Sequence, residues 1–433
     1  MKFFDEVKKK LLGIVDEMDT HRFDFVKNPL KNFTRKRKVF FTDIFKYLIN
    51  LQSQTTEQEI LHFYRFDTNH PTASALSQQR DKLKLDAFSY ILHQLNEAFP
   101  PQRKYNGYRL IACDGSDVSL PLYKNTQGKE DYTCRKREGS RDYYQCHIHT
   151  LYDVESQRYL DVRMEPRKKA NEKRALKEML QAGNFEPNTI FLLDRGYEAY
   201  DPLFLIDSIG CKFLCRVKNG NDGGIVKGFH LSHGEEFDLT FHRIFSRSNA
   251  KKVKESPEIY HRIYTQKDSV ILGKGRLEYE MTLRIVRVKI ENSYVCFLTN
   301  LSEEEFSMEE IKELYWKRWK IETSFRHLKY AVRLVDFHSK KIEFIQQEIL
   351  ARIILYNFTQ IIIKEVHIPN RSTQYTYQVN TTVAIYICRN FLVCDESYFD
   401  VEALIQRETL PIRLGRKYER NLRKHSAVGF GYR

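Results

Sequence analysis

The fold is decided by residues 189–218, which read TIFLLDRGYEAYDPLFLIDSIGCKFLCRVK. A short apolar run (189–194) is followed by a segment with apolar residues at helical spacing (197–209) and by a second apolar run (212–218). The change from strand-like to helical periodicity and back is typical of a sheet that carries helices on its faces. The stretch therefore predicts part of an α/β core.

Three further strands and a helix are predicted before this stretch. The strands are GYRLIAC (107–113), HIHTLYDV (147–154) and YLDVRMEP (159–166), and the helix is NEKRALKEMLQA (171–182). The second and third strands form a predicted hairpin around residues 155–157. Three strands, helix, strand, helix and strand is the order of a ribonuclease-H-like mixed sheet, an α/β architecture with helices on both faces. We predict this fold class.

The regions that flank this core differ from it in pattern. Residues 1–100 are helical by pattern, residues 219–299 alternate like antiparallel strands with no convincing helix between them, and helical patterns return at 307–332, 342–368 and 379–393. The predicted parts are a helical DNA-binding region (1–100), a ribonuclease-H-like catalytic domain (101–218 and 300–345), a β-strand insertion (219–299), and a C-terminal helical region with a basic tail (346–433).

The charge balance indicates the class of partner. The 433 residues hold 71 Lys and Arg against 57 Asp and Glu, a formal net charge of +14. A basic chain of this kind most often binds a polyanion, because neutralising phosphates releases counterions. With 42% hydrophobic residues the chain is not disordered, collagen-like or a coiled coil.

We expect a cytoplasmic protein without a membrane segment, associated with the nucleoid when it is bound to DNA. The most apolar stretch, 349–363, is interrupted by Arg352, Asn357 and Gln360 and is shorter than the ~20 residues that a span needs. The N-terminus has no apolar core or cleavage site of a signal peptide. Eight cysteines without a CxxC pair predict reduced, mostly buried thiols.

Several features of the N-terminal region and the tail allow a role in DNA binding. Residues 55–59 offer a capping box, residues 66–71 break the helix, and TASALSQQR (72–80) begins a second one, which is compatible with a helix-turn-helix DNA reader or with a plain packing pair. RKRK (35–38) is either a phosphate-contacting patch or a solvated loop. The last 29 residues hold eight Lys or Arg and two Glu, typical of a solvated tail or a phosphate contact.

Two aspartates stand where α/β sheets build their sites. Asp114 and Asp194 each follow an apolar strand, and Gly115 or Arg195-Gly196 comes next. A single Asp at such a place is more often a turn former or helix cap. Here, however, the two acids lie on strands that are expected to be neighbours. Each has a glycine nearby that permits close approach of a ligand, and together they make a candidate site. Asp117 and Asp153 remain rival candidates.

A third acid lies on the helix YWKRWKIETSFRHLK (315–329). At roughly 100° per residue, its polar side chains Tyr315, Arg318, Glu322 and Lys329 share a stripe about 60° wide beside an apolar stripe, as on a helix that borders a cleft. Ser324 is predicted on the opposite, solvent side. The alternative is a surface ladder at i, i+4 spacing, worth a few tenths of a kcal/mol per pair, which does not explain Tyr315 and Lys329.

The chemistry of three such acids points to divalent cations. Carboxylates brought together without metal repel one another. Two hard cations about 3.5 to 4 Å apart, held by carboxylate oxygens, remove this conflict and can activate a water or 3′-hydroxyl for in-line phosphoryl displacement. Asp, Asp and Glu on such a sheet in a basic protein fit that chemistry.

These residues resemble the insertion-sequence-four group of DDE transposases. Tyr315, Arg318, Glu322 and Lys329 have the spacing of its Tyr-x2-Arg-x3-Glu-x6-Lys signature. Asp114-Gly115, Asp194-Arg195-Gly196-Tyr197 and Thr299-Asn300-Leu301 also match its pattern, and the resemblance covers about residues 107–332.

The resemblance implies a triad of Asp114, Asp194 and Glu322 that binds Mg²⁺ or Mn²⁺, with two ions per site. It implies cut-and-paste transposition of double-stranded DNA between terminal inverted repeats by a homodimer, through nicking, hairpin formation, hairpin opening and strand transfer. Tyr315, Arg318 and Lys329 would hold phosphates while a terminal base is flipped. The β insertion between Asp194 and Glu322 is a family feature as well.

One departure and several alternatives remain open. Hairpin-forming relatives can stack the flipped base on a Trp of the insertion, whereas the two Trp residues here are Trp316 and Trp319 on the signature helix, so that Tyr or Phe would substitute or the hairpin is absent. His147 and His149 suggest a structural or surface role rather than zinc, because two further ligands are not in range. The competing functions are a ribonuclease-H-like structure-specific nuclease and a non-catalytic, transposase-derived DNA-binding repressor.

Overall fold

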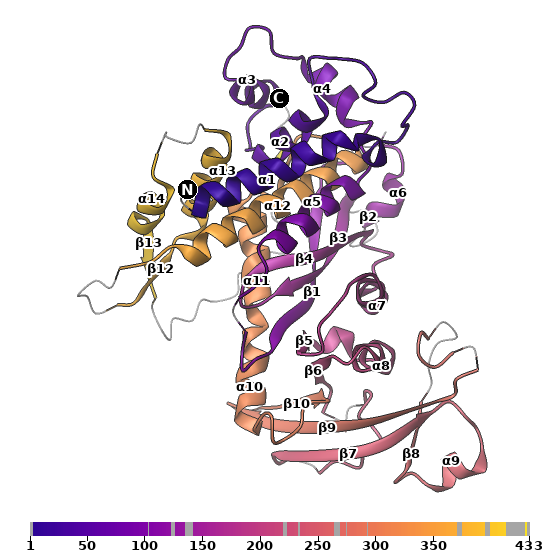
Figure 1. Ribbon diagram of the computed structural model, residues 1–433. Coiled ribbons are helices and arrows are strands. Elements are labelled where there is room, and N and C mark those ends of the chain that lie inside the picture. Colours follow the sequence, from indigo (N-terminus) through magenta and orange to yellow (C-terminus); the bar gives the residue numbers. More distant parts are fainter. Residues whose placement is uncertain are drawn as a thin grey trace.

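A mixed β-sheet forms the centre of the protein (Figure 1). The computed structural model describes residues 3–102, 104–122, 126–134, 142–219, 223–232, 234–263, 269–273, 275–291, 293–369, 375–394, 399–412 and 429–430. Ten strands in these ranges run in the order β2-β3-β1-β5-β6-β10-β9-β7-β8, with β4 beside β3. Their bounds are β1 Arg109–Leu120, β2 Thr133–Cys134, β3 Tyr143–Asp153, β4 Arg158–Pro166, β5 Thr189–Leu193, β6 Lys212–Val217, β7 Phe237–Ser246, β8 Tyr260–Arg262, β9 Glu278–Ile290 and β10 Ser293–Thr299.

The core of this sheet is built from β1, β3, β4, β5 and β6, which lie where the sequence predicts strands. β1, β3 and β4 pair antiparallel, while β5 pairs parallel with β1 and with β6. In this register Cys113 of β1 lies opposite Leu193 of β5, and Leu193 lies opposite Cys215 of β6. The predicted hairpin turn around residues 155–157 is confirmed, because β3 ends at Asp153 and β4 begins at Arg158. The α/β class is therefore confirmed.

Helices cover both faces of the sheet, as predicted. Along β1, Leu110 and Ala112 point into one apolar core, while Ile111 and Cys113 point into the other. The second core is closed by α7 (Glu172–Ala182) and α8 (Tyr200–Ser208). Each fully buried aliphatic side chain contributes about 1.5–3 kcal/mol, so this two-sided burial fixes the register of the central strands.

The strands of 219–299 extend the same sheet. β10 pairs antiparallel with β6, β9 with β10 and β7 with β9. Asn300, directly after β10, accepts a hydrogen bond from the Phe213 N–H (2.8 Å) and donates one to Asp207 (2.8 Å), which fastens β10 to β6 and α8. The expectation of no helix in this region is wrong, since the short α9 (Lys251–Glu255) lies between β7 and β8.

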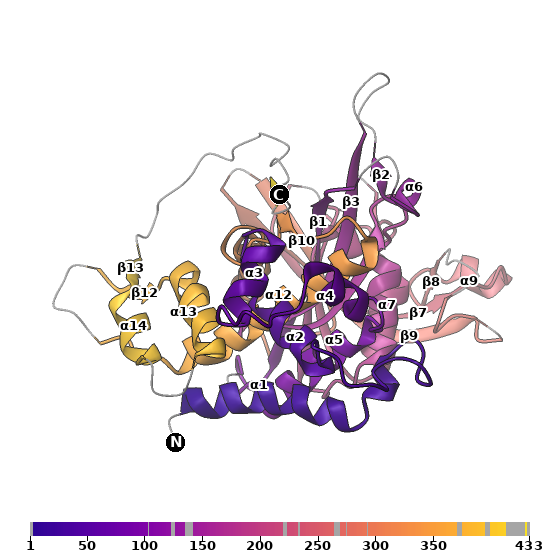
Figure 2. The same cartoon turned by 90° about the horizontal axis from the view of Figure 1, so that it is seen from above.

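Helices from both ends of the chain form one layer above the sheet (Figure 2). α12 (Ile342–Glu365) is buried along most of its length and packs against α2, α5 and α13. The expected border between residues 345 and 346 lies inside this helix, and the division into four parts stays a prediction. The other helices are α1 Phe3–Thr20, α2 Phe41–Asn50, α3 Thr56–Phe63, α4 Ala73–Arg80, α5 Asp86–Ala98, α6 Lys129–Tyr132, α10 Met308–Lys317, α11 Trp319–Arg326, α13 Thr381–Val393 and α14 Val401–Arg407.

Two small sheets, β11 (Asp336–Phe337) with β14 (Gly429–Phe430) and β12 (Tyr377–Val379) with β13 (Thr409–Pro411), complete the described elements. Most of the basic tail falls outside the described residues. All eight cysteines lie inside them, unpaired, and seven are buried, in agreement with the prediction. Within the described ranges no helix is both long and apolar enough to cross a membrane.

A buried ion network joins α3 and α4 to α12. Glu348, fully buried, pairs with Arg80 (3.1 Å) and with His338 Nδ1 (3.6 Å), and His338 Nε2 lies 3.5 Å from Glu59. Burial lowers the pKa of His338, but the contacts with Glu348 and Glu59 outweigh burial and raise it to about 9. Burial raises the pKa of Glu348, but His338 and Arg80 lower it to about 2.

This network predicts a loss of stability in mildly alkaline solution. Because the pKa of His338 is raised from 6.5 to about 9, its stabilising contribution is complete below pH 6.5 and is lost as the pH rises through 9. We expect this loss to be on the order of 2 kcal/mol in the free energy of unfolding. Thermal unfolding should show a smaller difference in stability between pH 6 and pH 9 for His338→Gln than for the wild type. Equal differences would contradict a charged His338.

Candidate active site

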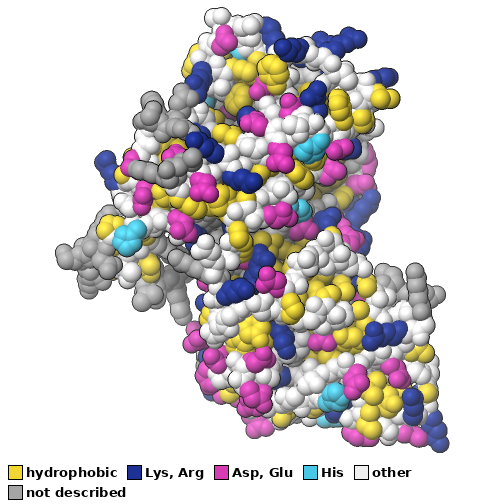
Figure 3. Space-filling view, in the orientation of Figure 1, with side chains coloured by type: hydrophobic (Ala, Val, Ile, Leu, Met, Phe, Trp, Pro, Cys, Tyr) yellow, Lys and Arg dark blue, Asp and Glu magenta, His cyan; other side chains and the backbone are white. Residues whose placement is uncertain are grey.

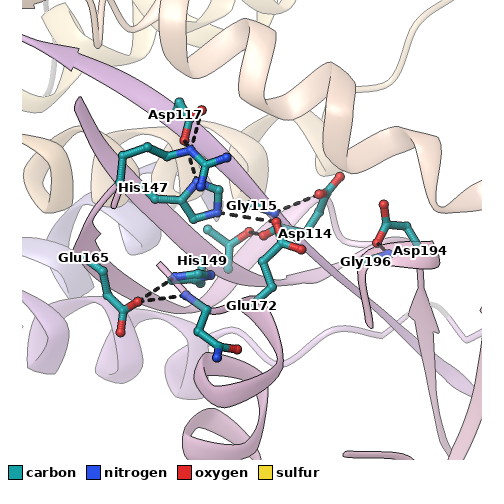
Figure 4. A network of polar contacts seen from close by, with 12 residues as sticks. Asp114, Gly115, Asp117, His147, His149, Glu165, Glu172, Asp194 and Gly196 are labelled. Carbon is teal, nitrogen blue, oxygen red and sulfur yellow. Dashed lines mark hydrogen bonds and ion pairs between the residues drawn. The ribbon is translucent and has the colours of Figure 1, made fainter. Parts of the chain in front are cut away.

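Asp114 and Asp194 lie side by side at one edge of the parallel part of the sheet (Figure 4). β1 pairs with β5 from Arg109 to Cys113 only, so Asp114 is the first residue beyond this pairing, as Asp194 is the first beyond β5. The strand itself continues to Leu120 against β3. The expectation that Asp114 ends its strand is therefore wrong, yet the neighbourhood of the two acids is as expected.

The helix that carries the third acid is interrupted. α10 (Met308–Lys317) begins with a capping box in which Ser307 accepts a hydrogen bond from the Glu310 N–H. It ends before Arg318, α11 (Trp319–Arg326) follows, and a single π turn spans His327–Ala331. The change of hydrogen-bond pattern places Arg318 at the joint of the two helices, directed at the sheet edge.

Arg318 connects the helix to the sheet. One guanidinium nitrogen, Nη1, donates to Asp114 Oδ2 (3.2 Å), and the other, Nη2, donates to Glu322 Oε1 (3.1 Å). Arg318 is 4% exposed, so its charge depends on these two carboxylates for compensation. The contact brings Asp114 and Glu322 to the same place, although 208 positions separate them in the numbering of the chain.

The acids influence one another electrostatically. Burial raises the pKa of Asp114 to about 6, and the charges of Asp194 and Glu322 act in the same direction. Arg318 and the Gly115 N–H, which donates to Asp114 Oδ1 (2.8 Å), oppose this shift. Such a concentration of carboxylates is expected where a cation is to be bound.

The other two signature residues, Tyr315 and Lys329, lie in different surroundings. Tyr315 is 3% exposed, its ring packs on Phe297 (4.8 Å between centroids), and its buried hydroxyl has no hydrogen-bond partner among the described residues. Lys329 lies farther along the helix, where Asp117 is the charge that opposes the lowering of its pKa by burial. The structure thus brings Arg318 and Glu322 to Asp114.

Some expectations about neighbouring residues are wrong. Ser324 is buried and its hydroxyl lies 2.6 Å from that of Tyr159, so this side of the helix does not face solvent. Asp153, one of the rival acids, is buried and accepts a hydrogen bond from Arg109 (2.8 Å), which is a structural role. The expectation that the two histidines have no further possible metal ligands near them is wrong as well. His147 contacts Asp117 and His149 contacts Glu165.

Asp114, Asp194 and Glu322 offer the type of ligand that a hard divalent cation binds. Carboxylate oxygens are the ligands that Mg²⁺ and Mn²⁺ prefer. In the described ranges no three His, Cys, Asp or Glu side chains converge closely enough to hold a metal as they stand. Arg318 occupies the space between Asp114 and Glu322, so the triad would gather around a cation only when this pairing loosens.

Comparisons with known proteins identify the class. The sequence profile described as "Transposase DDE domain" matches residues 105–358, more than half of the chain. The protein belongs to this family. Membership in this family supports DNA transposition as the class of activity.

A search of curated proteins finds no match. Seven chains of solved structures match. One of them is from a cryo-electron microscopy structure of a piggyBac transposase synaptic complex with hairpin DNA, at 9% identity and a TM-score of 0.46, over 91% of this chain and 80% of that chain.

Gly115 offers a test of how tightly the site is built. A Cβ at this position would collide with Nε2 of His147, a residue of β3 whose ring is buried. Gly115→Ala should therefore displace His147 and lower the free energy of unfolding by about 1–3 kcal/mol. Gly13→Ala, on the exposed face of α1 with nothing within 4 Å of the new atom, should be neutral or stabilising. Chemical unfolding measures the free energy of unfolding of both variants. An unchanged value for Gly115→Ala would refute the close approach of His147 to Gly115.

Proposed function

We propose that the protein is the transposase of an insertion sequence, and that it cleaves DNA at the ends of its element and joins the freed 3′ ends to target DNA. The observation that carries this proposal is the meeting of Asp114 and Glu322 on Arg318, beside Asp194. We assign the catalytic sheet to the ribonuclease-H-like architecture on its strand order, and the chain to the insertion-sequence-four group on its signature residues.

In the proposed mechanism, Asp114, Asp194 and Glu322 bind Mg²⁺ or Mn²⁺ through their carboxylate oxygens. Two such ions would activate a water or 3′-hydroxyl and stabilise the leaving oxygen in an in-line displacement. Asp114 is only partly exposed, and Arg318 balances the negative charges of Asp114 and Glu322.

The signature residues would then hold the DNA backbone. When Asp114 and Glu322 turn to the cation, the guanidinium of Arg318 becomes available for a phosphate, which it can bind with two parallel hydrogen bonds. The unpartnered hydroxyl of Tyr315 is a donor beside Arg318, whose guanidinium lies 5.4 Å from the Tyr315 ring. Lys329 would serve the next phosphate along the strand, near Asp117.

Hairpin formation is supported by the two tryptophans of the signature helix. Trp316 and Trp319 are 43% and 42% exposed, so they are not core residues. Their rings stack at 6.2 Å and 28°, and Arg318 lies 5.4 Å from the Trp319 ring. Exposed aromatic rings beside a phosphate-binding group can stack on an unpaired base. In our proposal they receive the flipped terminal base.

The N-terminal region supplies a basic surface for the inverted repeats. Lys31, Arg35, Lys36 and Arg37 are exposed, without a side-chain partner among the described residues. A cavity of about 250 Å³ lined by Lys31, Arg35, Arg37 and Lys82 adjoins α4. Lys and Arg side chains line the upper edge of the face in Figure 3, over α4 and the loop before α2. We name residues 31–37 the basic loop.

α4 itself differs from a helix-turn-helix reader. Its connection to α3 runs from residue 64 to 72, longer than the usual three or four residues. Arg80 is directed inward to Glu348 and is not available to bases. Ser74, Ser77 and Gln78 remain exposed and are the side chains of α4 that we expect to reach DNA.

The remaining parts of the proposal concern assembly. A homodimer would pair the two element ends, and the protein would act in the cytoplasm, at the nucleoid. The four-part division of the chain, with DNA binding in 1–100 and catalysis in 101–218 and 300–345, is part of the same proposal.

Replacing one carboxylate tests catalysis. With Mg²⁺ and DNA that carries the ends of its own element, Glu322→Gln should lose about 10³-fold or more in cleavage, because a group that acts as part of one unit is removed. End binding without metal should be unchanged. Glu313→Gln, at an exposed position of α10, is the matched control and should cleave like the wild type. Cleavage by Glu322→Gln at the wild-type rate would remove Glu322 from the mechanism.

The basic loop is tested by salt dependence. Each phosphate contact contributes about 0.9 to the slope of log K against log salt concentration. Arg35→Gln combined with Arg37→Gln should reduce this slope by up to about 1.8, and should weaken binding to all sequences alike. The matched pair Lys9→Gln and Lys10→Gln, exposed on α1, should leave it unchanged. An equal effect of both pairs would show that charge alone, not the basic loop, matters.

A further inference from the structure

A second polar chain reaches the catalytic edge from the side of α7 (Figure 4). Asp117 Oδ1 lies 2.6 Å from His147 Nδ1, and Asp117 is also held by Arg167 Nε (2.9 Å). The other imidazole nitrogen, His147 Nε2, lies 3.6 Å from Glu172 Oε1. The chain of contacts therefore runs from Asp117 through His147 to Glu172.

His147 is fixed in this direction. Its ring is 5% exposed and packs against the bare Cα of Gly115, next to Asp114. The contact with Asp117 fixes the direction of the ring, as in imidazoles that are oriented by a carboxylate. Nε2 is buried and has no hydrogen-bond partner among the described residues. An unpaired buried nitrogen is thus aimed at the carboxylate of Glu172.

Glu172 in turn faces Asp194. An atom placed at the Cβ position of Gly196 would lie 2.6 Å from Glu172 Oε2 and 3.0 Å from Asp194 Oδ1. Both carboxylates therefore border the same small space, which stays open because residue 196 has no side chain. Asp194 also raises the pKa of Glu172, after burial, which agrees with this proximity.

Helix capping alone does not account for this arrangement. Glu172 stands in the first turn of α7, where an acid stabilises a helix by about 0.3–1 kcal/mol. Asn171 already caps the helix by accepting a hydrogen bond from the Arg174 N–H (3.1 Å). A purely structural Glu172 would need neither the oriented His147 nor the glycine that keeps its carboxylate near Asp194.

We propose that Glu172 is a positioning residue of the catalytic centre, a fourth carboxylate that strengthens divalent-cation binding at Asp194, and that the Asp117–His147 pair holds it in place. This inference rests on the proposed function, because it takes Asp194 as a cation ligand. Residues that orient or support a metal site typically change metal affinity 10- to 100-fold when they are replaced.

The test measures Mn²⁺ binding to the full-length protein without DNA, by the electron paramagnetic resonance signal of free Mn²⁺. Glu172→Gln should weaken Mn²⁺ binding about 10- to 100-fold, with an unchanged circular dichroism spectrum and unchanged binding to end DNA in the absence of metal. Glu178→Gln, exposed on the same helix, is the matched control and should bind Mn²⁺ like the wild type.

A double-mutant cycle tests the role of His147. If His147 acts through Glu172, His147→Gln should weaken Mn²⁺ binding, and the double variant should bind no more weakly than Glu172→Gln alone. Independent effects that multiply in the double variant would show that His147 does not position Glu172. Glu172→Asp, which keeps the charge, should restore part of the affinity that Glu172→Gln loses.

Asp194→Asn separates the two proposals. If it abolishes Mn²⁺ binding while Glu172→Gln stays within twofold of the wild type, the role of Glu172 is refuted and the triad stands. If Asp194→Asn leaves Mn²⁺ binding unchanged, the proposed catalytic centre itself is refuted. A Glu172→Gln protein that is less stable but binds Mn²⁺ normally would show that Glu172 only caps α7.

Discussion

The bidentate contact of Arg318 with Asp114 and Glu322 is the interaction on which the site depends. A buried guanidinium is costly unless carboxylates compensate its charge, and here one carboxylate comes from the sheet and the other from the helix. Glu322 meets Arg318 within the helix, so the docking of α10–α11 on the sheet edge is set by the contact of Arg318 with Asp114. The same contact compensates the charges of Asp114 and Glu322, and it places next to these acids the guanidinium that we propose binds a DNA phosphate.

The rest of the fold brings the sheet edge to that contact. Parallel pairing of β1 with β5 sets Asp194 beside Asp114, and burial on both faces prevents a slip of this register. On the far side, the buried network around Glu348 joins α3 and α4 to α12, so the proposed DNA-binding surface has a fixed connection to the segment that follows the signature helix. The proposed DNA-binding surface and the proposed catalytic site are thus joined by packed elements within the described residues.

Much of this was predictable from sequence because the periodic signals were strong. Apolar runs predicted β5 and β6, and the spacing of Arg318 and Glu322 indicated that they lie on the same face of a helix. The length of β1 was missed, since Gly115 and Asp117 break the apolar pattern while β3 still pairs with them. The inward turn of Arg80 and the burial of Ser324 depend on partners distant in sequence, Glu348 and Tyr159. Glu172 was missed for the same reason, because its relation to Asp194 arises only when α7 packs against β1, β3 and the short turn that follows Asp194.

The central claim is that Asp114, Asp194 and Glu322 form one divalent-cation centre. Anomalous diffraction from crystals of the protein with Mn²⁺ and its end DNA measures this directly. The account predicts a manganese peak within about 2.0–2.6 Å of carboxylate oxygens of Asp114 and Asp194, with Arg318 turned from Asp114 toward a DNA phosphate. Manganese bound elsewhere, with the contact between Arg318 and Asp114 intact in the DNA complex, would contradict it.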